Sequence, residues 1–188
     1  MGRFERSRDH IQSAITGLRK RLRDDPEVDP LIWPIYRELA CSQRPLRDHP
    51  EYHDCNPLPP EAAPLVAAWV QQISTSGIKS VICLLTPEQL RRYDDLPGMR
   101  DGLIGAYREA GLAVLHIPVF DKAHPESMDG CEILGPEVYA KAYQGFIDLP
   151  KAVLLHCSAA FDRTSPVAAE IVLRAKKQLF WTPRPSRP

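Results

Sequence analysis

The chain lacks several features that would assign it to a class at once. Its 24 Lys and Arg residues are balanced by 24 Asp and Glu residues, so the net charge is zero and no bulk attraction to nucleic acid is expected. No apolar run approaches the ~18–20 residues that cross a bilayer, and the charged N-terminus leads into no apolar signal segment. The 5 cysteines are odd in number and irregularly spaced, which does not fit a disulfide framework. These absences predict a cytoplasmic protein without a membrane span or a nucleic-acid partner, and they leave its oligomeric state open.

What is present suffices for one folded domain. A chain of 188 residues with 44% hydrophobic residues is expected to form a single core. We expect a helical extension over residues 1–29, because apolar residues recur at helical spacing between residues 4 and 22. The basic residues of this extension favour a solvated helix face over an anion-binding surface. Residues 30–180 are predicted to form the main domain, and the proline-rich residues 181–188 a disordered tail.

Extended and helical patterns alternate along the main domain. Short apolar runs predict strands within residues 31–41, 79–85, 112–118 and 151–156. Helical spacing and capping residues predict helices over residues 61–75, 100–110, 136–147 and 166–179. This alternation predicts an α/β fold with a central, mostly parallel sheet flanked by helices. In such sheets, ligands bind beyond the carboxyl ends of the strands. The apolar face predicted for the helix at 61–75 consists of Leu65, Ala68, Trp69 and Ile73.

The segment between the last predicted strand and the last predicted helix reads His-Cys-Ser-Ala-Ala-Phe-Asp-Arg-Thr, residues 156–164. Backbone N–H groups of a tight loop at a helix N-terminus converge on one point, and the helix dipole favours an anion there. The same field stabilises the thiolate form of Cys157, which is the nucleophilic form. Arg163 can offer two parallel N–H bonds to phosphate oxygens, and the Thr164 hydroxyl can hydrogen-bond the sulfur as it leaves phosphorus. The segment is therefore predicted to be a phosphate-binding loop with a nucleophile at its base.

Spacing alone is weak support, because Cys41 and Arg47 are separated by the same five residues. That second segment has no histidine before its cysteine, and Pro45 removes one loop N–H. A further proline, Pro50, follows where a helix should begin. Context therefore favours Cys157 over Cys41 as the nucleophile, and it also favours that role over a buried structural thiol.

The segment resembles the signature of the protein tyrosine phosphatase superfamily, which is His-Cys, five residues, Arg, then Ser or Thr. His156, Cys157, Arg163 and Thr164 match it, and the layout of residues 30–180 resembles the small dual-specificity-like branch. The resemblance implies attack on phosphorus by Cys157, support of the loop by His156, and no metal or cofactor. Ala160 departs from the family, which usually has Gly there, so a Cβ is expected to crowd the loop or strain its backbone. The residues implied to bind the substrate are Ser158, Ala159, Ala160, Phe161, Asp162 and Arg163.

Cleavage of a phosphate ester requires a proton donor for the leaving oxygen and then a base that activates water, and one carboxyl group can do both. Asp121 is the first candidate, because it begins a long polar loop after a strand and its surroundings resemble those of the family's general acid. Asp162 is the second, because Asp-Arg-Thr within the loop resembles myotubularin-like and some bacterial lipid-and-protein phosphatases. The alternatives are a solvated carboxylate for Asp121 and an arginine partner or helix cap for Asp162. The sequence favours Asp121 as the acid, with Asp162 as helper or alternative.

These features together predict a cysteine-dependent phosphoric monoester hydrolase of the tyrosine or dual-specificity type, acting through a thiophosphate intermediate. Its substrate, a phosphorylated protein, a phospholipid or a small phosphoester, is not specified by the sequence. One alternative is a phosphate-binding pseudophosphatase that serves as an interaction module, which Ala160 favours. Another is an RNA 5′-triphosphatase, which the zero net charge disfavours. His49, His53 and Cys55 lack a second pair of ligands, so no metal site is predicted there.

Overall fold

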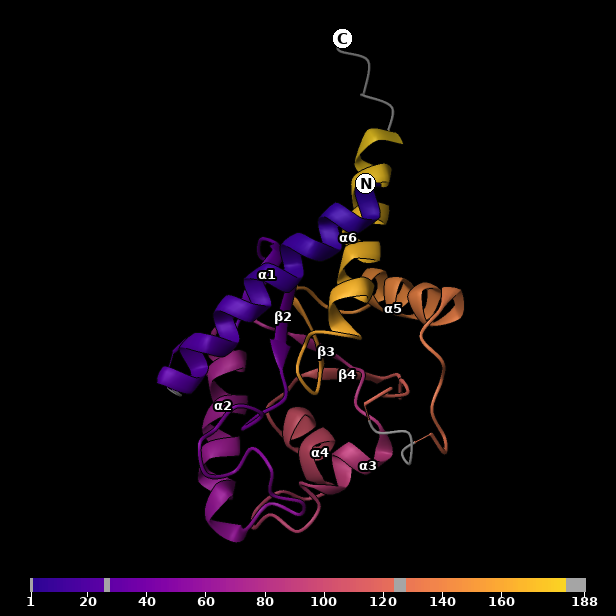
Figure 1. The fold of residues 1–188 in the computed structure, drawn as a ribbon. Helices are drawn as coiled ribbons and strands as arrows, with labels where there is room; N and C mark the ends of the chain where they lie inside the picture. Colours follow the sequence, from indigo (N-terminus) through magenta and orange to yellow (C-terminus); the bar gives the residue numbers. More distant parts are fainter. Residues whose placement is uncertain (1, 26–27, 124–127, 182–188) are drawn as a thin grey trace.

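The computed structural model describes residues 2–25, 28–123 and 128–181, and it confirms the α/β fold class (Figure 1). Within these residues, five strands form one sheet in the order β1-β2-β5-β3-β4. β1 pairs with β2 in the antiparallel sense, whereas the pairs β2–β5, β5–β3 and β3–β4 are parallel. The carboxyl ends of four strands therefore meet at one edge of the sheet. The strands are Ile32–Ile35 (β1), Leu39–Gln43 (β2), Ser80–Cys83 (β3), Ala113–His116 (β4) and Val153–Cys157 (β5).

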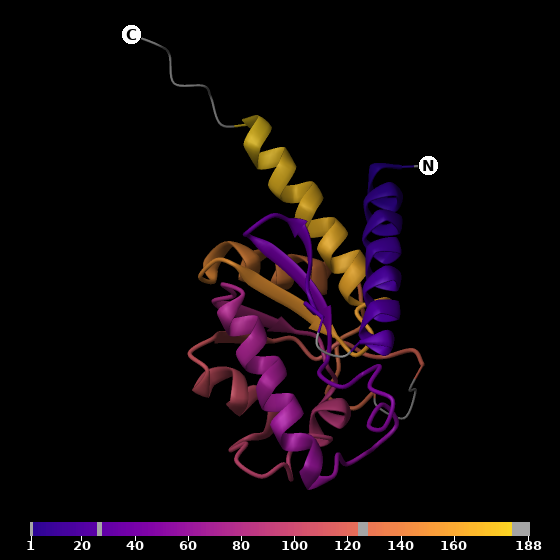
Figure 2. The ribbon, with the colours of Figure 1, turned by 90° about the vertical axis from the view of Figure 1, so that its left-hand side faces the viewer.

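Helices cover both faces of this sheet (Figures 1 and 2). Helices α1, α5 and α6 pack on one face, and helices α2, α3 and α4 lie on the other. Burial on both faces is the usual environment of a parallel sheet. The helices are Arg3–Asp24 (α1), Ala63–Thr75 (α2), Pro87–Arg91 (α3), Gly102–Glu109 (α4), Pro136–Asp148 (α5) and Thr164–Trp181 (α6), with a 3-10 turn, Pro60–Ala62 (η1), before α2.

The central strand β5 shows how the sequence divides the core in two. Val153, Leu155 and Cys157 face α1, α5 and α6, whereas Ala152 and Leu154 belong to the core on the α2 side. This alternation follows from the two-residue period of a strand. Each fully buried Leu or Val contributes roughly 1.5–3 kcal/mol to folding. As a consequence, Cys157 and the residue before it point to opposite faces of the sheet.

Helix α1 has the apolar stripe that the sequence predicted. Ile11, Ile15, Leu18 and Leu22 are buried, and Ile11 and Ile15 belong to the same core as Cys157. The helix packs along α6 and also contacts β1 and β2 (Figure 2). The first helix of the chain thus lies beside the helix that follows the candidate loop.

The structure differs from the predictions at two helices. The apolar face predicted for α2 is wrong at Leu65, which is 40% exposed, and at Ala68, which is also exposed; Val66 and Val70 are buried instead, together with the correctly predicted Ile73. Two overlapping sets of apolar residues occur at helical spacing in α2, and the set that contains Val66, Val70 and Ile73 packs on the sheet. Helix α3 was not predicted at all, although Thr86 and Gln89 form a capping box with Pro87 in the first helical turn.

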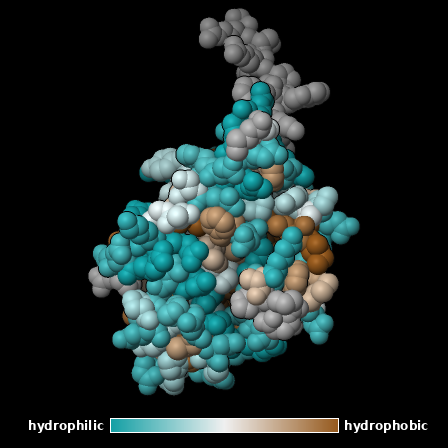
Figure 3. Space-filling view, in the orientation of Figure 1, coloured by the Kyte–Doolittle hydropathy of each residue, from teal (hydrophilic) through white to brown (hydrophobic). Residues whose placement is uncertain are grey.

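The last helix begins at Thr164, two residues before the predicted start, because a proline in the first turn needs no N–H partner. It ends at Trp181, the first residue of the tail predicted over 181–188, so the prediction is wrong at Trp181; residues 182–188 lie outside the described residues. In the part of the chain that the structure describes, no helix combines the length and the apolar character that crossing a membrane requires. On the face shown in Figure 3, hydrophilic residues predominate and hydrophobic ones form separate patches.

Candidate active site

A cavity of about 550 Å³ lies at the carboxyl ends of the parallel strands. Residues that follow β2, β3, β4 and β5 all contribute to its lining. This is the position at which open α/β sheets bind ligands. It brings together most of the residues that the sequence predicted for the site, while His156, Ala160 and Thr164 are buried behind the lining. The predicted residues that line the cavity are Cys157, Ser158, Ala159, Phe161, Asp162, Arg163 and Asp121.

Cys157 is the last residue of β5 and is 1% exposed. Residues 158–163 form the turn that follows it, and α6, an 18-residue helix, begins immediately afterwards. The positive end of the helix dipole is therefore close to the thiol. Hydrogen bonds hold the turn from both sides: the Arg44 backbone N–H donates to the Ser158 carbonyl (3.0 Å), and the Ser165 hydroxyl donates to the Ala160 carbonyl (3.1 Å). The predicted strand, loop and helix thus surround one thiol.

Arg163 is 3% exposed and forms hydrogen bonds to several segments around the cavity. Its Nη1 donates to the carbonyls of Leu84 (3.0 Å) and Val119 (3.1 Å) and to Oε1 of Gln89 (3.0 Å). Its Nη2 donates to Oδ2 of Asp121 at 2.6 Å. Among the described residues, these bonds occupy Nη1 and one hydrogen of Nη2, which leaves Nε–H and the second Nη2–H for a bidentate contact with an anion.

The two candidate acids occupy different environments. Asp121 is 8% exposed; its Oδ2 accepts from Arg163 and from Gln89 Nε2 (2.7 Å), and its Oδ1 accepts from the Ala123 N–H (3.2 Å). Asp162 is exposed and lines the cavity, and within the described part of the chain it forms no hydrogen bond or ion pair. The carboxylate that pairs with Arg163 is therefore Asp121, and Asp162 is the one directed to the open cavity.

Ala160 has the backbone conformation that its departure from the family pattern suggested. Its φ is 59°, in the left-handed region, and its side chain is fully buried in the same core as Cys157. For a residue with a Cβ this conformation costs about 1–2 kcal/mol, and burial of the methyl group offsets about 0.8 kcal/mol of that. The loop therefore keeps the fold that a glycine would allow, at some cost in strain.

His156 and Thr164 lie behind the cavity. The ring of His156 hydrogen-bonds the Tyr107 hydroxyl through Nε2 (3.1 Å) and makes edge contacts with Trp69 and Tyr107. Burial lowers the pKa of His156 to about 3, so the ring is neutral at physiological pH and carries no proton for the reaction. The Thr164 hydroxyl is buried and has no hydrogen-bond partner among the described residues. It is therefore free to interact with a group bound in the loop.

Sequence reasoning missed four arginines of the cavity, which we call the arginine wall. They come from α1, from the turn after β2 and from the residue after α3. Because these segments are far apart in sequence, no local pattern could have grouped them. Gln89 was missed as well, although its capping box was visible in the sequence. The arginine wall consists of Arg19, Arg44, Arg47 and Arg92.

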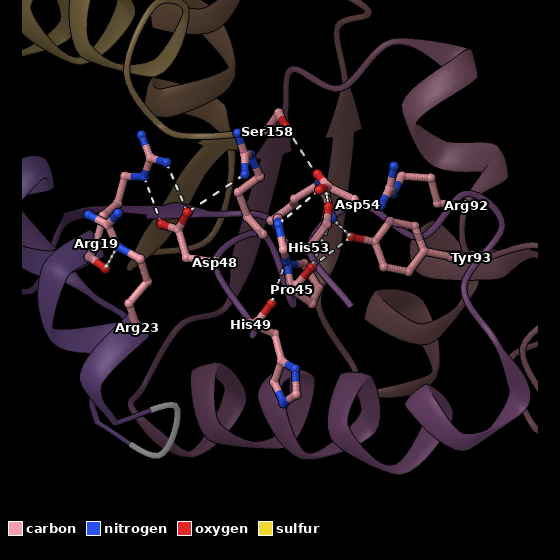
Figure 4. A network of polar contacts seen from close by, with 12 residues as sticks. Arg19, Arg23, Pro45, Asp48, His49, His53, Asp54, Arg92, Tyr93 and Ser158 are labelled. Carbon is pink, nitrogen blue, oxygen red and sulfur yellow. Dashed lines mark hydrogen bonds and ion pairs between the residues drawn. The ribbon is translucent and has the colours of Figure 1, made fainter. Parts of the chain in front are cut away.

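One carboxylate, Asp48, serves two of these arginines. Arg19 contacts both oxygens of Asp48, at 2.7 and 2.9 Å, and Arg47 approaches it to 3.6 Å. Although burial alone would raise the pKa of Asp48, the hydrogen bond and charge of Arg19 hold it below its ordinary value. Figure 4 shows Arg19 and Asp48 on one side of this polar network and Arg92 and Tyr93 on the other, with His53 between them.

Potential metal ligands do not gather in the described residues. There, no group of three or more His, Cys, Asp or Glu side chains is placed to hold an ion. The histidine segment instead makes local contacts: His49 stacks on Tyr52, and His53 pairs with Asp54 at 2.9 Å.

A solved structure is similar to this chain in fold. No family model matches the chain, and no curated protein matches it in sequence. The fold is similar to the crystal structure of a kinase-associated phosphatase in which a serine replaces the catalytic-site cysteine. The TM-score is 0.47 and the identity 19%, and the match covers 72% of this chain and 65% of that one. At this level the similarity concerns the fold alone and carries no argument about chemistry.

Proposed function

We propose that this chain is a cysteine-dependent phosphatase that hydrolyses phosphate monoesters. The observation that carries the proposal is the position of Cys157 and Arg163 at the two ends of one turn, beside the N-terminus of a long helix and lining a single cavity. A nucleophile, a planar cation and a helix dipole then act on the same anion. The phosphatase type, the substrate and the cytoplasmic location expected from the sequence remain predictions.

In the first step, the Cys157 sulfur attacks phosphorus. The S–P bond forms as the P–O bond to the leaving group breaks, and the leaving oxygen takes a proton from a carboxylic acid. Arg163 and the N–H groups of the loop stabilise the charge on the equatorial oxygens in the transition state. In the second step, water attacks phosphorus and gives a proton to the same carboxylate. The S–P bond breaks and inorganic phosphate leaves. The Thr164 hydroxyl, which has no hydrogen-bond partner among the described residues, would donate to the departing thiolate.

The contacts change the order of the two acids. Both oxygens of Asp121 accept hydrogen bonds from the protein, one of them from Arg163. A general acid must instead direct a proton to the substrate. Asp162, exposed and lining the cavity, meets that requirement better. We therefore propose Asp162 as the proton donor and Asp121, favoured by the sequence, as the residue that positions Arg163.

The proposal is tested by trapping the intermediate. Purified protein is mixed with a radiolabelled phosphate monoester and quenched with acid, and we expect label on the wild-type protein and on Cys55→Ser but none on Cys157→Ser. Cys55 is a suitable control because its thiol donates a hydrogen bond to the Glu51 carbonyl and does not line the cavity. Turnover of p-nitrophenyl phosphate should fall by at least about a thousandfold in Cys157→Ser. Equal turnover by Cys157→Ser would refute the covalent mechanism.

A second candidate function is phosphate binding without turnover. Two observations favour it: Arg163 already has a carboxylate partner, and Ala160 adopts a left-handed conformation. A protein of this kind would bind phosphate or vanadate equally well as wild type and as Cys157→Ser, and neither protein would release phosphate from any monoester. Calorimetry with vanadate, run beside the turnover assay, separates the two functions.

A further inference from the structure

Two guanidinium groups of the arginine wall, those of Arg44 and Arg92, have no carboxylate in contact among the described residues. Arg44 is buried, and its guanidinium donates to neutral oxygens alone, namely Ser158 Oγ, the carbonyls of Pro45 and His53, and the Tyr93 hydroxyl, at 3.3–3.4 Å. Arg92 donates to the same His53 carbonyl at 3.1 Å. Among the described residues, neither arginine has a carboxylate oxygen within 4.0 Å, so two guanidinium groups converge on one carbonyl without a counter-ion.

The remaining charges of the cavity do not supply that counter-ion. Arg19 and Arg47 share Asp48, and Asp121 pairs with Arg163. Asp54 contacts His53 at 2.9 Å, and its negative charge also acts on Arg47. Glu88 pairs with Arg91, which does not line the cavity. Asp162 lies on the candidate loop, where its charge interacts with Arg19. Within the described residues, Arg44 and Arg92 are therefore left without a carboxylate in contact, beside the candidate loop.

The arginines also repel one another. Burial and then the charge of Arg44 lower the pKa of Arg92 to about 10, and the same two causes lower the pKa of Arg47. The Nε of Arg92 is buried and has no hydrogen-bond acceptor in the described part of the chain. An anion in contact with these groups would relieve the repulsion and satisfy the donor.

The dimensions and chemistry of the cavity indicate the kind of anion. A volume of about 550 Å³ is in the range of sites for small organic ligands and exceeds what one phosphate needs. Phe161 is the one large apolar side chain among the described lining residues, so the space suits a polar body. Arg44 donates to Ser158 of the loop, which places the arginine wall directly beside the predicted phosphate.

We propose that the arginine wall binds a second phosphate of the same substrate, so that the site takes a small sugar or polyol that carries at least two phosphates. This inference rests on the proposed function for the phosphate that is cleaved. The second phosphate is held by Arg92 and Arg47, with Arg44 behind them, and it stays attached during the reaction.

The experiment compares a hexose monophosphate with the matching hexose bisphosphate as substrates. Wild-type protein should show at least about a tenfold higher kcat/KM for the bisphosphate. Arg92→Met should lose most of this preference, because it removes a proposed contact to the second phosphate. Arg91→Met is the matched control, because Arg91 is the adjacent residue, is largely exposed and does not line the cavity. It should keep the full preference.

Arg47→Met provides a second variant if Arg92→Met does not fold, which thermal unfolding reports. Equal kcat/KM values of the wild-type protein for the two substrates would overturn the second-phosphate site, as would loss of the preference in Arg91→Met. A stronger preference for a doubly phosphorylated peptide would overturn the assignment to a small polyol. A phosphorylated polyol can also be the headgroup of a lipid. The kcat/KM for phosphatidylinositol bisphosphate in vesicles, compared with that for the soluble inositol bisphosphate, distinguishes the two sources. A preference for either form over its monophosphate supports the site.

Failure of the proposed function can be told apart from failure of this inference. If no substrate is hydrolysed, calorimetry on the wild-type protein still compares binding of the two hexose phosphates. Tighter binding of the bisphosphate, reduced in Arg92→Met, would retain the second-phosphate site in a protein that is not an enzyme. Equal binding of both would overturn the site.

Discussion

Two segments of this chain place a cysteine and an arginine at the same spacing, and both begin within parallel strands that pair with each other. Cys157 is the last residue of β5, and a helix begins directly after Arg163. Cys41 lies in the middle of β2, two residues before its end, and no helix follows Arg47. Burial raises the pKa of the Cys41 thiol well above its ordinary value, which suits an inert core residue. The point at which the strand ends, more than the spacing, decides which thiol can reach a ligand.

The second segment nevertheless contributes to the site. Arg47 lines the same cavity as Arg163, and Arg44 donates to Ser158 of the candidate loop. Each segment also contains one non-glycine residue with a φ near 60°, Ala160 in one and Leu46 in the other. A segment that lacks the features of a catalytic loop thus contributes to the wall that faces the candidate loop.

The largest effect within this comparison is expected at Asp162, the acidic residue before Arg163. The second segment has Leu46 at the corresponding position. Asp162→Asn should slow hydrolysis of an alkyl phosphate by about a hundredfold and that of an activated aryl phosphate much less, because a good leaving group departs without a proton. Asp121→Asn should slow both substrates to a similar extent through its contact with Arg163. Steady-state kinetics of both variants on both substrates make the decision, and the reverse pattern would return the role of acid to Asp121.

The next effect compares the two arginines. Arg163→Lys should lower kcat/KM more than tenfold, because an ammonium group cannot form the bidentate contact or bond Leu84, Val119 and Asp121 together. Arg47→Lys should lose less, since it contacts one carboxylate at 3.6 Å. Arg91→Lys serves as the exposed control. Retention of more than about a tenth of the activity in Arg163→Lys, a loss of less than 1.4 kcal/mol, would argue against its assigned role.

The two segments also differ in the residue before the cysteine, which is His156 in one and Ala40 in the other. This difference leads to a prediction about how the stability of the fold depends on pH. Burial lowers the pKa of His156 from 6.5 to about 3, so the unfolded chain binds this proton more tightly than the folded one. His156 therefore contributes fully to stability above about pH 6.5, and this contribution is lost as the pH falls toward 3. The slope in that window approaches 1.4 kcal/mol per pH unit.

Urea unfolding at several pH values between 7 and 5 measures this effect. His156→Asn should show a smaller loss of unfolding free energy over this range than the wild-type protein, whatever its stability at pH 7. His10→Asn, which alters an exposed histidine of α1, should keep the wild-type slope. Parallel curves for wild type and His156→Asn would show that the ring is not held neutral by the fold.

The smallest effect is expected at the strained position of the loop. Ala160→Gly should leave kcat/KM unchanged or raise it up to a few-fold, because glycine adopts φ 59° without strain. Ala159→Gly is the matched control: its φ is not positive, so glycine there should add flexibility and lower activity. A clear fall in kcat/KM for Ala160→Gly at unchanged thermal stability would mean that the loop has adapted to alanine.

The sequence predicted those parts of the molecule that depend on local patterns. The strand before Cys157, the helix after Arg163 and the α/β alternation follow from apolar periodicity and capping residues, and the structure contains them. The pairing of Arg163 with Asp121 and the assembly of the arginine wall could not be predicted, because they join residues from different elements. Helix α3 falls between these cases: its capping box was visible, but five residues give too little periodicity to indicate a helix.

The contact between the first and the last helix has a consequence for how the site is made. Arg19 of α1 forms part of the cavity only while α1 lies along α6, so residues from near both ends of the sequence must meet before the cavity is complete. Contacts over such separations form late, because they close the longest loops of the chain. A refolding chain would thus bring together the Cys157 thiol, the candidate loop and the other three arginines of the wall before Arg19 joins them. Cutting the chain between α1 and β1 should accordingly open the cavity while leaving the sheet in place.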